Sequence, residues 1–155
     1  MNAAAVRAQV RDQAALAHQQ WTRQERQKAC VQVMDMYAAF NAESVRRREQ
    51  LEARTVLDEA SLQSYAASSI NLIAACSHLA LLGPDAVQAA GGELRRSAER
   101  FVGTLRWVNE ELAELAEQPD EMPAEWLESL AEDGQAMKVA YLEFMRVSQS
   151  VLLSG

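Results

Sequence analysis

The chain has 155 residues, 49% of them apolar and 24% charged, which is typical of a single globular domain with its own core. Its formal net charge of −7 argues against nucleic acid or an anionic lipid surface as a partner, because both are bound through clustered Lys and Arg. The sequence has neither a signal-peptide pattern nor a run of 18 apolar residues, so we expect a cytoplasmic protein without a membrane span.

The first 82 residues contain no glycine or proline, which predicts helix through nearly all of this stretch. From Cys30 to Leu51, apolar residues recur at spacings of three, four and seven, the pattern of a helix with one buried face. We expect the turn at 55–59, with Asp58 as the N-cap of the next helix. A weaker apolar stripe lies upstream and consists of Val6, Val10, Ala14, Ala17 and Trp21.

A second helix follows and carries apolar side chains around most of its circumference, so we expect it to be the most buried of the helices. Gly83 and Pro84 mark its end. Glycine is favoured where a helix ends in the left-handed conformation, and proline is favoured in the first turn of the helix that follows. We therefore expect Gly83 to be left-handed and Pro84 to begin a third helix.

The third helix repeats apolar residues at alternating spacings of three and four from Val87 onward. Gly91 and Gly92 interrupt this pattern early and predict either a kink or a close helix contact. The polar segment 118–123 predicts a loop, after which Trp126 begins the apolar pattern of a fourth helix.

These elements predict an all-α, antiparallel four-helix bundle with an overlong first helix. The second to fourth helices would each be roughly 37–50 Å long at about 1.5 Å per residue, whereas a first helix over residues 3–54 would reach about 75 Å. The polar run 22–28 marks the expected start of the bundle. We therefore divide the chain into an N-terminal helical extension, residues 1–20, and a four-helix bundle domain, residues 21–155.

No group of residues in the sequence predicts a catalytic, cofactor or metal site. The ExxH motif of metal-binding bundles is absent at His18 and His78. Cys30 and Cys76 lie in apolar stretches without a CxxC spacing, which favours buried thiols in a reducing compartment. The common phosphate-loop, dinucleotide, serine-hydrolase and zinc-protease motifs are also missing. We therefore expect a non-enzymatic protein without a cofactor.

Two clusters of charge are expected on the surface. The three arginines at 46–48 are flanked by glutamates at spacings of three and four, which predicts a solvated, self-paired helix face. Ten acidic residues late in the chain favour solubilising charge, although a docking site for a basic partner is the alternative. They are Glu110, Glu111, Glu114, Glu117, Asp120, Glu121, Glu125, Glu128, Glu132 and Asp133.

Two functions follow from these features. The apolar stripe on the extension favours self-association, as a homodimer, or binding to another protein, and its alternative is a frayed or folded-back terminus. The second function is that of a regulatory bundle that binds a small molecule in an apolar pocket between helices, near Trp107 and Met137.

Several packing residues resemble those of a known group of proteins. The segments 21–26, 37–40 and 79–90, together with Phe144, resemble small α-helical proteins of unknown function from high-GC actinobacteria. The resemblance covers most of the chain from residue 21 onward and implies a helical bundle, with no catalytic residues to carry over. Many proteins of that group begin with a membrane-spanning helix, whereas residues 1–20 here are too polar to cross a bilayer.

Overall fold

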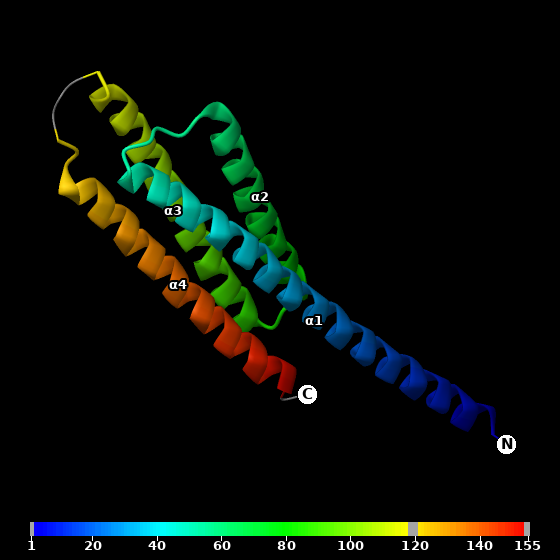
Figure 1. Ribbon diagram of the computed structural model, residues 1–155. Helices are drawn as coiled ribbons and strands as arrows, with labels where there is room; N and C mark the ends of the chain where they lie inside the picture. Colours follow the sequence, from blue (N-terminus) through cyan, green and yellow to red (C-terminus); the bar gives the residue numbers. More distant parts are fainter. Residues whose placement is uncertain (1, 118–120, 154–155) are drawn as a thin grey trace.

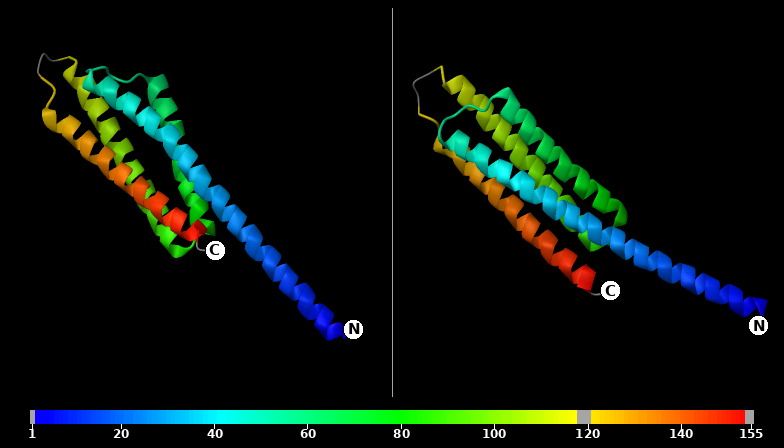
Figure 2. Two further views of the ribbon diagram at one scale, coloured as in Figure 1. Left: turned by 60° about the horizontal axis from the view of Figure 1, so that its bottom comes forward. Right: turned by 45° about the vertical axis from the view of Figure 1, so that its right-hand side comes forward.

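The computed structural model describes residues 2–117 and 121–153 and shows an antiparallel bundle of four helices (Figure 1, Figure 2). The helices are α1 (Ala3–Glu52), α2 (Glu59–Leu82), α3 (Asp85–Leu115) and α4 (Ala124–Leu153). No strand occurs in the described ranges. The predicted all-α four-helix bundle with an overlong first helix is therefore confirmed. Part of the predicted loop, residues 118–120, lies outside the described residues, as does Asp120 of the acidic set.

One face of each helix contributes to a single core. α3 contacts all three other helices and buries 11 of its 31 residues, whereas α2 buries six of its 24. Within the described residues α2 packs on α1 and α3 but not on α4, so its remaining side faces solvent, with Ile70 62% and Leu81 82% exposed. The prediction that the second helix is the most buried is wrong, because it has apolar residues on more sides than it has neighbours to cover them.

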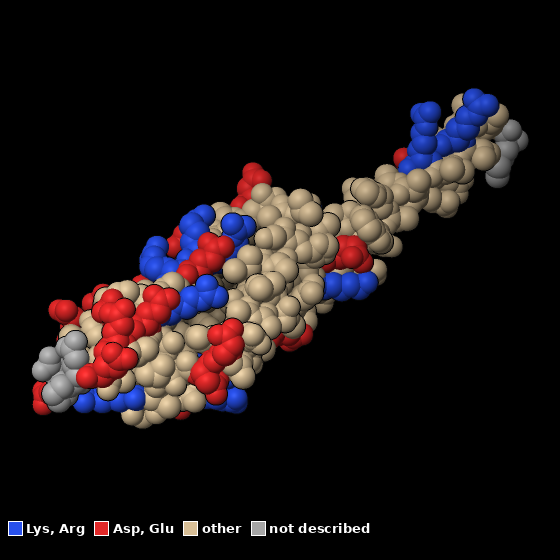
Figure 3. Space-filling model, turned by 90° about the horizontal axis from the view of Figure 1, so that it is seen from above, with Lys and Arg blue, Asp and Glu red and all other residues tan. Residues whose placement is uncertain are grey.

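The solvent side of α2 is uncharged. Between Glu59 and its end at Leu82 the helix carries no Lys, Arg, Asp or Glu, and Figure 3 shows a broad uncharged area across the middle of the bundle. Among the described helices, α2 alone is long and apolar enough by length and composition to cross a membrane, with a mean hydropathy of 1.4 over the window tested. One third of that window is buried inside the bundle, and a helix that packs in a core passes the same test of length and composition.

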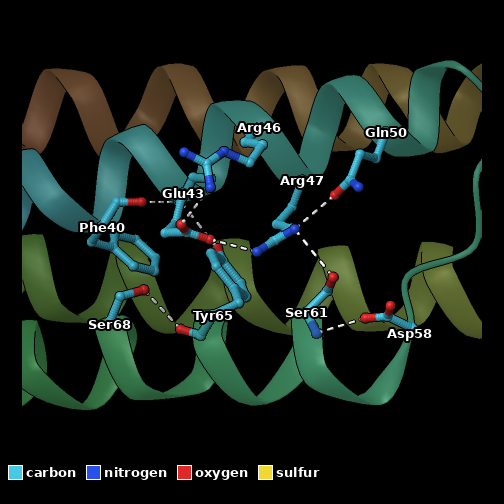
Figure 4. A network of polar contacts seen from close by, with 10 residues as sticks. Phe40, Glu43, Arg46, Arg47, Gln50, Asp58, Ser61, Tyr65 and Ser68 are labelled. Atoms are coloured by element: carbon cyan, nitrogen blue, oxygen red, sulfur yellow. Dashed lines mark hydrogen bonds and ion pairs between the residues drawn. The ribbon is translucent and has the colours of Figure 1, made fainter.

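A polar network joins α1 to α2 (Figure 4). It lies on the buried face of α1, where the spacing between Ser44 and Leu51 leaves one position without an apolar residue. Arg47 occupies this position and is only 7% exposed. Its Nη2 lies 2.9 Å from Oε2 of Glu43, and its Nη1 donates to Oε1 of Gln50 at 2.9 Å and to Oγ of Ser61 on α2 at 3.2 Å. The self-pairing predicted for residues 46–48 is confirmed, but the predicted solvent exposure is wrong for Arg47, which bridges the two helices.

The last turn of α1 ends in a left-handed residue that is not a glycine. Arg54 has a φ of 57°. Its N–H donates to the carbonyl of Leu51 at 2.9 Å, and the N–H of Thr55 donates to the carbonyl of Gln50 at 2.8 Å. This pair of bonds is the Schellman arrangement, which normally has glycine in the left-handed position because a Cβ there is strained.

We expect Arg54→Gly to raise the free energy of unfolding by about 1 kcal/mol, because glycine removes the strain of the left-handed residue at a small cost in chain entropy. Arg54→Ala is the matched control, since it removes the charge and keeps the Cβ. Urea denaturation of the three proteins measures the effect. A gain for alanine equal to that for glycine would show that charge, not backbone strain, is the cause.

Gly83, in the turn between α2 and α3, is not in the predicted conformation, and it lies in a tight place. Its φ of −82° and ψ of 156° are extended, so the left-handed prediction is wrong. A Cβ here would lie 3.2 Å from the carbonyl oxygen of Leu79 and 3.4 Å from Cβ of Val87, so a side chain would crowd both helix ends. Pro84 is the N-cap of α3 and not its first helical residue. α3 then continues uninterrupted past Gly91, whose added Cβ would contact the Leu79 side chain at 3.5 Å, as expected of a close helix contact.

Candidate functional site

Helix α1 continues well beyond the other three helices (Figure 1, Figure 2). We call residues 3–22 the arm. Every residue from Asn2 to Trp21 is exposed, and the arm neither unwinds nor folds back on the bundle. Seven alanines between positions 3 and 17 favour helix without help from packing, and the Asn2 side chain caps the first turn by accepting from the N–H of Ala4 at 3.1 Å. The arm is therefore a helix with no neighbour among the described residues of the chain.

Two arginines mark the point where α1 enters the bundle. Arg23 donates from Nη2 to the carbonyl of Leu152 at 3.2 Å, and Arg26 donates from Nε to the carbonyl of Leu82 at 2.5 Å. These carbonyls belong to the last turns of α4 and α2, where no further helical N–H is available to pair with them and where positive charge is favoured. The first buried residues of α1 follow directly, at Ala29. Arginine side chains from α1 thus cap a carbonyl at the end of each of these two helices.

The residues of the predicted stripe lie along one side of the arm. Their spacings of three and four place them on one helical face, and Val6, Val10 and Trp21 are 42%, 59% and 55% exposed. The ring of Trp21 stacks on that of His18, also in the arm, at a centroid distance of 6.0 Å. The arm therefore presents an apolar line to water, which is the arrangement expected of a helix that packs on another helix.

The apolar line does not end where the arm meets the bundle. Steps of seven residues along the continuous helix lead from Val10 and Ala17 to Gln24 and Val31. Val31 is 48% exposed, on the side of α1 turned away from buried neighbours such as Val33. A shallow depression of about 410 Å³ lies there. Its lining residues, Gln24, Gln27, Lys28, Val31, Gln32 and Asp35, form what we call the outer face of α1.

Sequence reasoning missed the outer face. The buried stripe from Cys30 onward drew attention to the opposite side of the helix, and the polar run 22–28 concealed the continuity between the arm and Val31. The seven-residue spacing of Val10, Ala17, Gln24 and Val31 was the signal that could have revealed it.

Charge is distributed unevenly along the molecule. The arm contains two basic residues, Arg7 and Arg11, and one acidic residue, Asp12, whereas residues 23–155 contain 13 basic and 21 acidic residues. Figure 3 shows Lys and Arg near the end of the arm and Asp and Glu gathered at the opposite end of the bundle, where α3 ends and α4 begins. The arm therefore has a net charge of +1, whereas residues 23–155 have a net charge of −8.

The two residues predicted to line a pocket lie in different places. Met137 is 2% exposed and lines a groove of about 480 Å³ between α1, α3 and α4, where Tyr37 and Tyr141 stack at 3.7 Å. Trp107 lies on the outside of α3, is 41% exposed and meets the ring of Trp126 edge-on at 5.9 Å. Binding of a small molecule in this groove stays a prediction.

The cysteines are placed as structural residues. Cys30 and Cys76 are both buried and free, as predicted. Burial raises the pKa of the Cys30 thiol and raises the pKa of Cys76 to about 11, which opposes formation of the thiolate that acts as a nucleophile. Over the described ranges, no three or more His, Cys, Asp or Glu side chains are grouped so that they could hold a metal ion.

No family model, curated protein or solved structure matches the chain significantly. The resemblance to the actinobacterial helical proteins therefore stays a prediction. The arm and the outer face of α1 are the features of this chain that a generic bundle does not need.

Proposed function

We propose that the protein is a non-enzymatic bundle that associates with a second copy of itself through the exposed side of α1. The observation that carries this proposal is the arm, about 20 residues and 30 Å long, whose apolar line is left uncovered by the residues that the structure describes. Burying that line against a second helix would remove Val and Trp side chains from water, at a gain of about 1.5–3 kcal/mol for each fully buried large side chain.

A second copy fits the arm better than an unrelated protein for two reasons. The apolar line and the outer face lie along the same side of α1. When two copies face each other with that side, the apolar line of each can therefore contact the outer face of the other. Arg7 and Arg11 also give the arm a small positive charge, which suits the carboxylate of Asp35 on the outer face of a second copy. An isologous contact uses each surface twice, which doubles the area that a short arm can bury.

Light scattering tests the proposal. We expect the intact protein to have about twice its chain mass of 17.2 kDa, and the chain without residues 2–21 to have the mass of one chain. Because the arm makes no contribution to the core, the shortened chain should unfold at the same urea concentration once both are monomeric, which is the control for folding. An intact protein that stays monomeric at high concentration, or a shortened chain that stays dimeric, would contradict the proposal.

A further inference from the structure

We infer that the two copies pair antiparallel along α1, with the arm of each lying on the outer face of the other. This inference rests on the proposed self-association and adds the surface that receives the arm. The arm needs a partner surface that is elongated, lies along a helix and is partly apolar, and the depression around Val31 has these properties. Because the apolar line and the outer face follow the same seven-residue spacing, the two surfaces stay in register along the pair.

The exposed valines set the register of the pair. When Val10 lies opposite the partner's Val31, antiparallel order places Ala17 opposite the partner's Gln24, so that small and polar residues share the rest of the contact. The two-fold axis then passes beside Trp21, and the two indole rings lie together at the centre. Buried tryptophan at the centre of an interface is a typical source of binding energy. The two bundles lie at opposite ends of the helix pair.

The charges on this side of α1 favour the antiparallel order over a parallel one. A parallel two-fold pair would place Lys28 against the partner's Lys28 and Asp35 against the partner's Asp35, and such like-charge contacts are repulsive. In the antiparallel pair, Arg7 instead comes beside the partner's Asp35, and the symmetry repeats this contact.

Docking of the arm on the acidic end of a second copy is the competing arrangement. It would satisfy the basic residues of the arm, but it would bring the apolar line against a surface dominated by carboxylates, which bury poorly without partners. Such a head-to-tail contact does not close on itself and produces chains that lengthen with concentration. The two arrangements therefore differ in mass as well as in contacts.

Cysteine crosslinking tests the inference. Val10→Cys and Val31→Cys chains, each first shown to keep the mass of the intact protein, are mixed and treated with a short bis-maleimide. We expect at least ten-fold more covalent dimer from the mixture than from either variant alone. Cys30 and Cys76 are buried and should not react. A mixture of Val10→Cys with Val45→Cys is the control, since Val45 is 39% exposed but lines the groove beside α4.

The outcomes separate the inference from the proposed function. A dimer that crosslinks Val10→Cys to itself as readily as to Val31→Cys is parallel, and it overturns the inference while leaving self-association intact. A dimer in which Val10→Cys and Val31→Cys are not crosslinked also overturns the inference and leaves self-association intact. Masses that rise beyond two chains with concentration would support the head-to-tail arrangement and overturn the antiparallel pair. A strict monomer would overturn the proposed function, and the inference with it.

Discussion

The Ala17→Asp substitution is expected to weaken self-association at least 100-fold, whereas Ala15→Asp leaves it unchanged. Both alanines are exposed and lie in the middle of the arm. They differ in direction by about 200° around the helix, so Ala17 lies on the apolar line and Ala15 on the opposite side. A carboxylate on the line is desolvated in each copy, at about 1–3 kcal/mol apiece. The two costs together come to about 4 kcal/mol at the middle of this range, above the roughly 2.7 kcal/mol that a 100-fold change requires.

Sedimentation equilibrium over a range of concentrations measures this effect. The pair of variants is closely matched, because the same side chain is introduced into the same helix and its cost in helix propensity is equal at both positions. A difference in association between the two variants therefore shows which side of the arm contacts the second copy. Equal weakening by both substitutions would mean that added negative charge on the arm, and not burial of the apolar line, reduces association.

The Glu43→Ala substitution is expected to lower the free energy of unfolding by about 2–3 kcal/mol, the largest loss that we expect from a single change in the polar network of Figure 4. Glu43 is the acidic partner of Arg47, whose side chain is only 9% exposed. Its removal leaves a desolvated guanidinium without its paired carboxylate. Gln50 and Ser61 remain as acceptors, and Asp58 remains as a more distant negative charge. A buried charge that loses its partner costs more than the pair was worth.

The Arg47→Met substitution is the informative control and should cost about 1 kcal/mol or less. It removes the charge while keeping an unbranched apolar stem, and Glu43 remains paired with Arg46 at 3.2 Å. Arg46→Ala should cost less than about 0.5 kcal/mol, because its side chain is 64% exposed. Urea denaturation of the monomeric chain measures all three. Equal losses for Glu43→Ala and Arg47→Met would show that the network stabilises by direct attraction and that desolvation of the arginine matters little.

Much of the fold could be predicted because helix boundaries depend on local chemistry. The absence of glycine and proline before Gly83, the N-cap Asp58 and the apolar spacing from Cys30 onward each act within a few residues of themselves. The structure has helices where these signals place them. The Asp58 side chain does accept from the N–H of Ser61, at 2.7 Å.

The candidate site could be predicted only in part. The exposed arm follows from length, because a first helix of 50 residues cannot be covered by helices of 24 to 31 residues. Its stripe from Val6 to Trp21 follows from spacing. The outer face could not be predicted in this way, because Gln24, Lys28 and Asp35 are polar. They can be recognised as one exposed surface only when the buried side of α1 is known.

The sequence by itself determined that the chain is helical, where its helices end, and that the first helix is too long for the bundle. Only the tertiary structure decided what each side of a helix meets. It shows that Arg47 is buried between α1 and α2, that α2 leaves Ile70 in solvent, and that Gly83 is extended in a tight place and not left-handed. The physical reason is that hydrogen bonding and propensity act along the chain, whereas burial depends on neighbours that are distant in sequence. The arm lacks such neighbours in the part of its own chain that the structure describes, and it is therefore where we expect a second copy to bind.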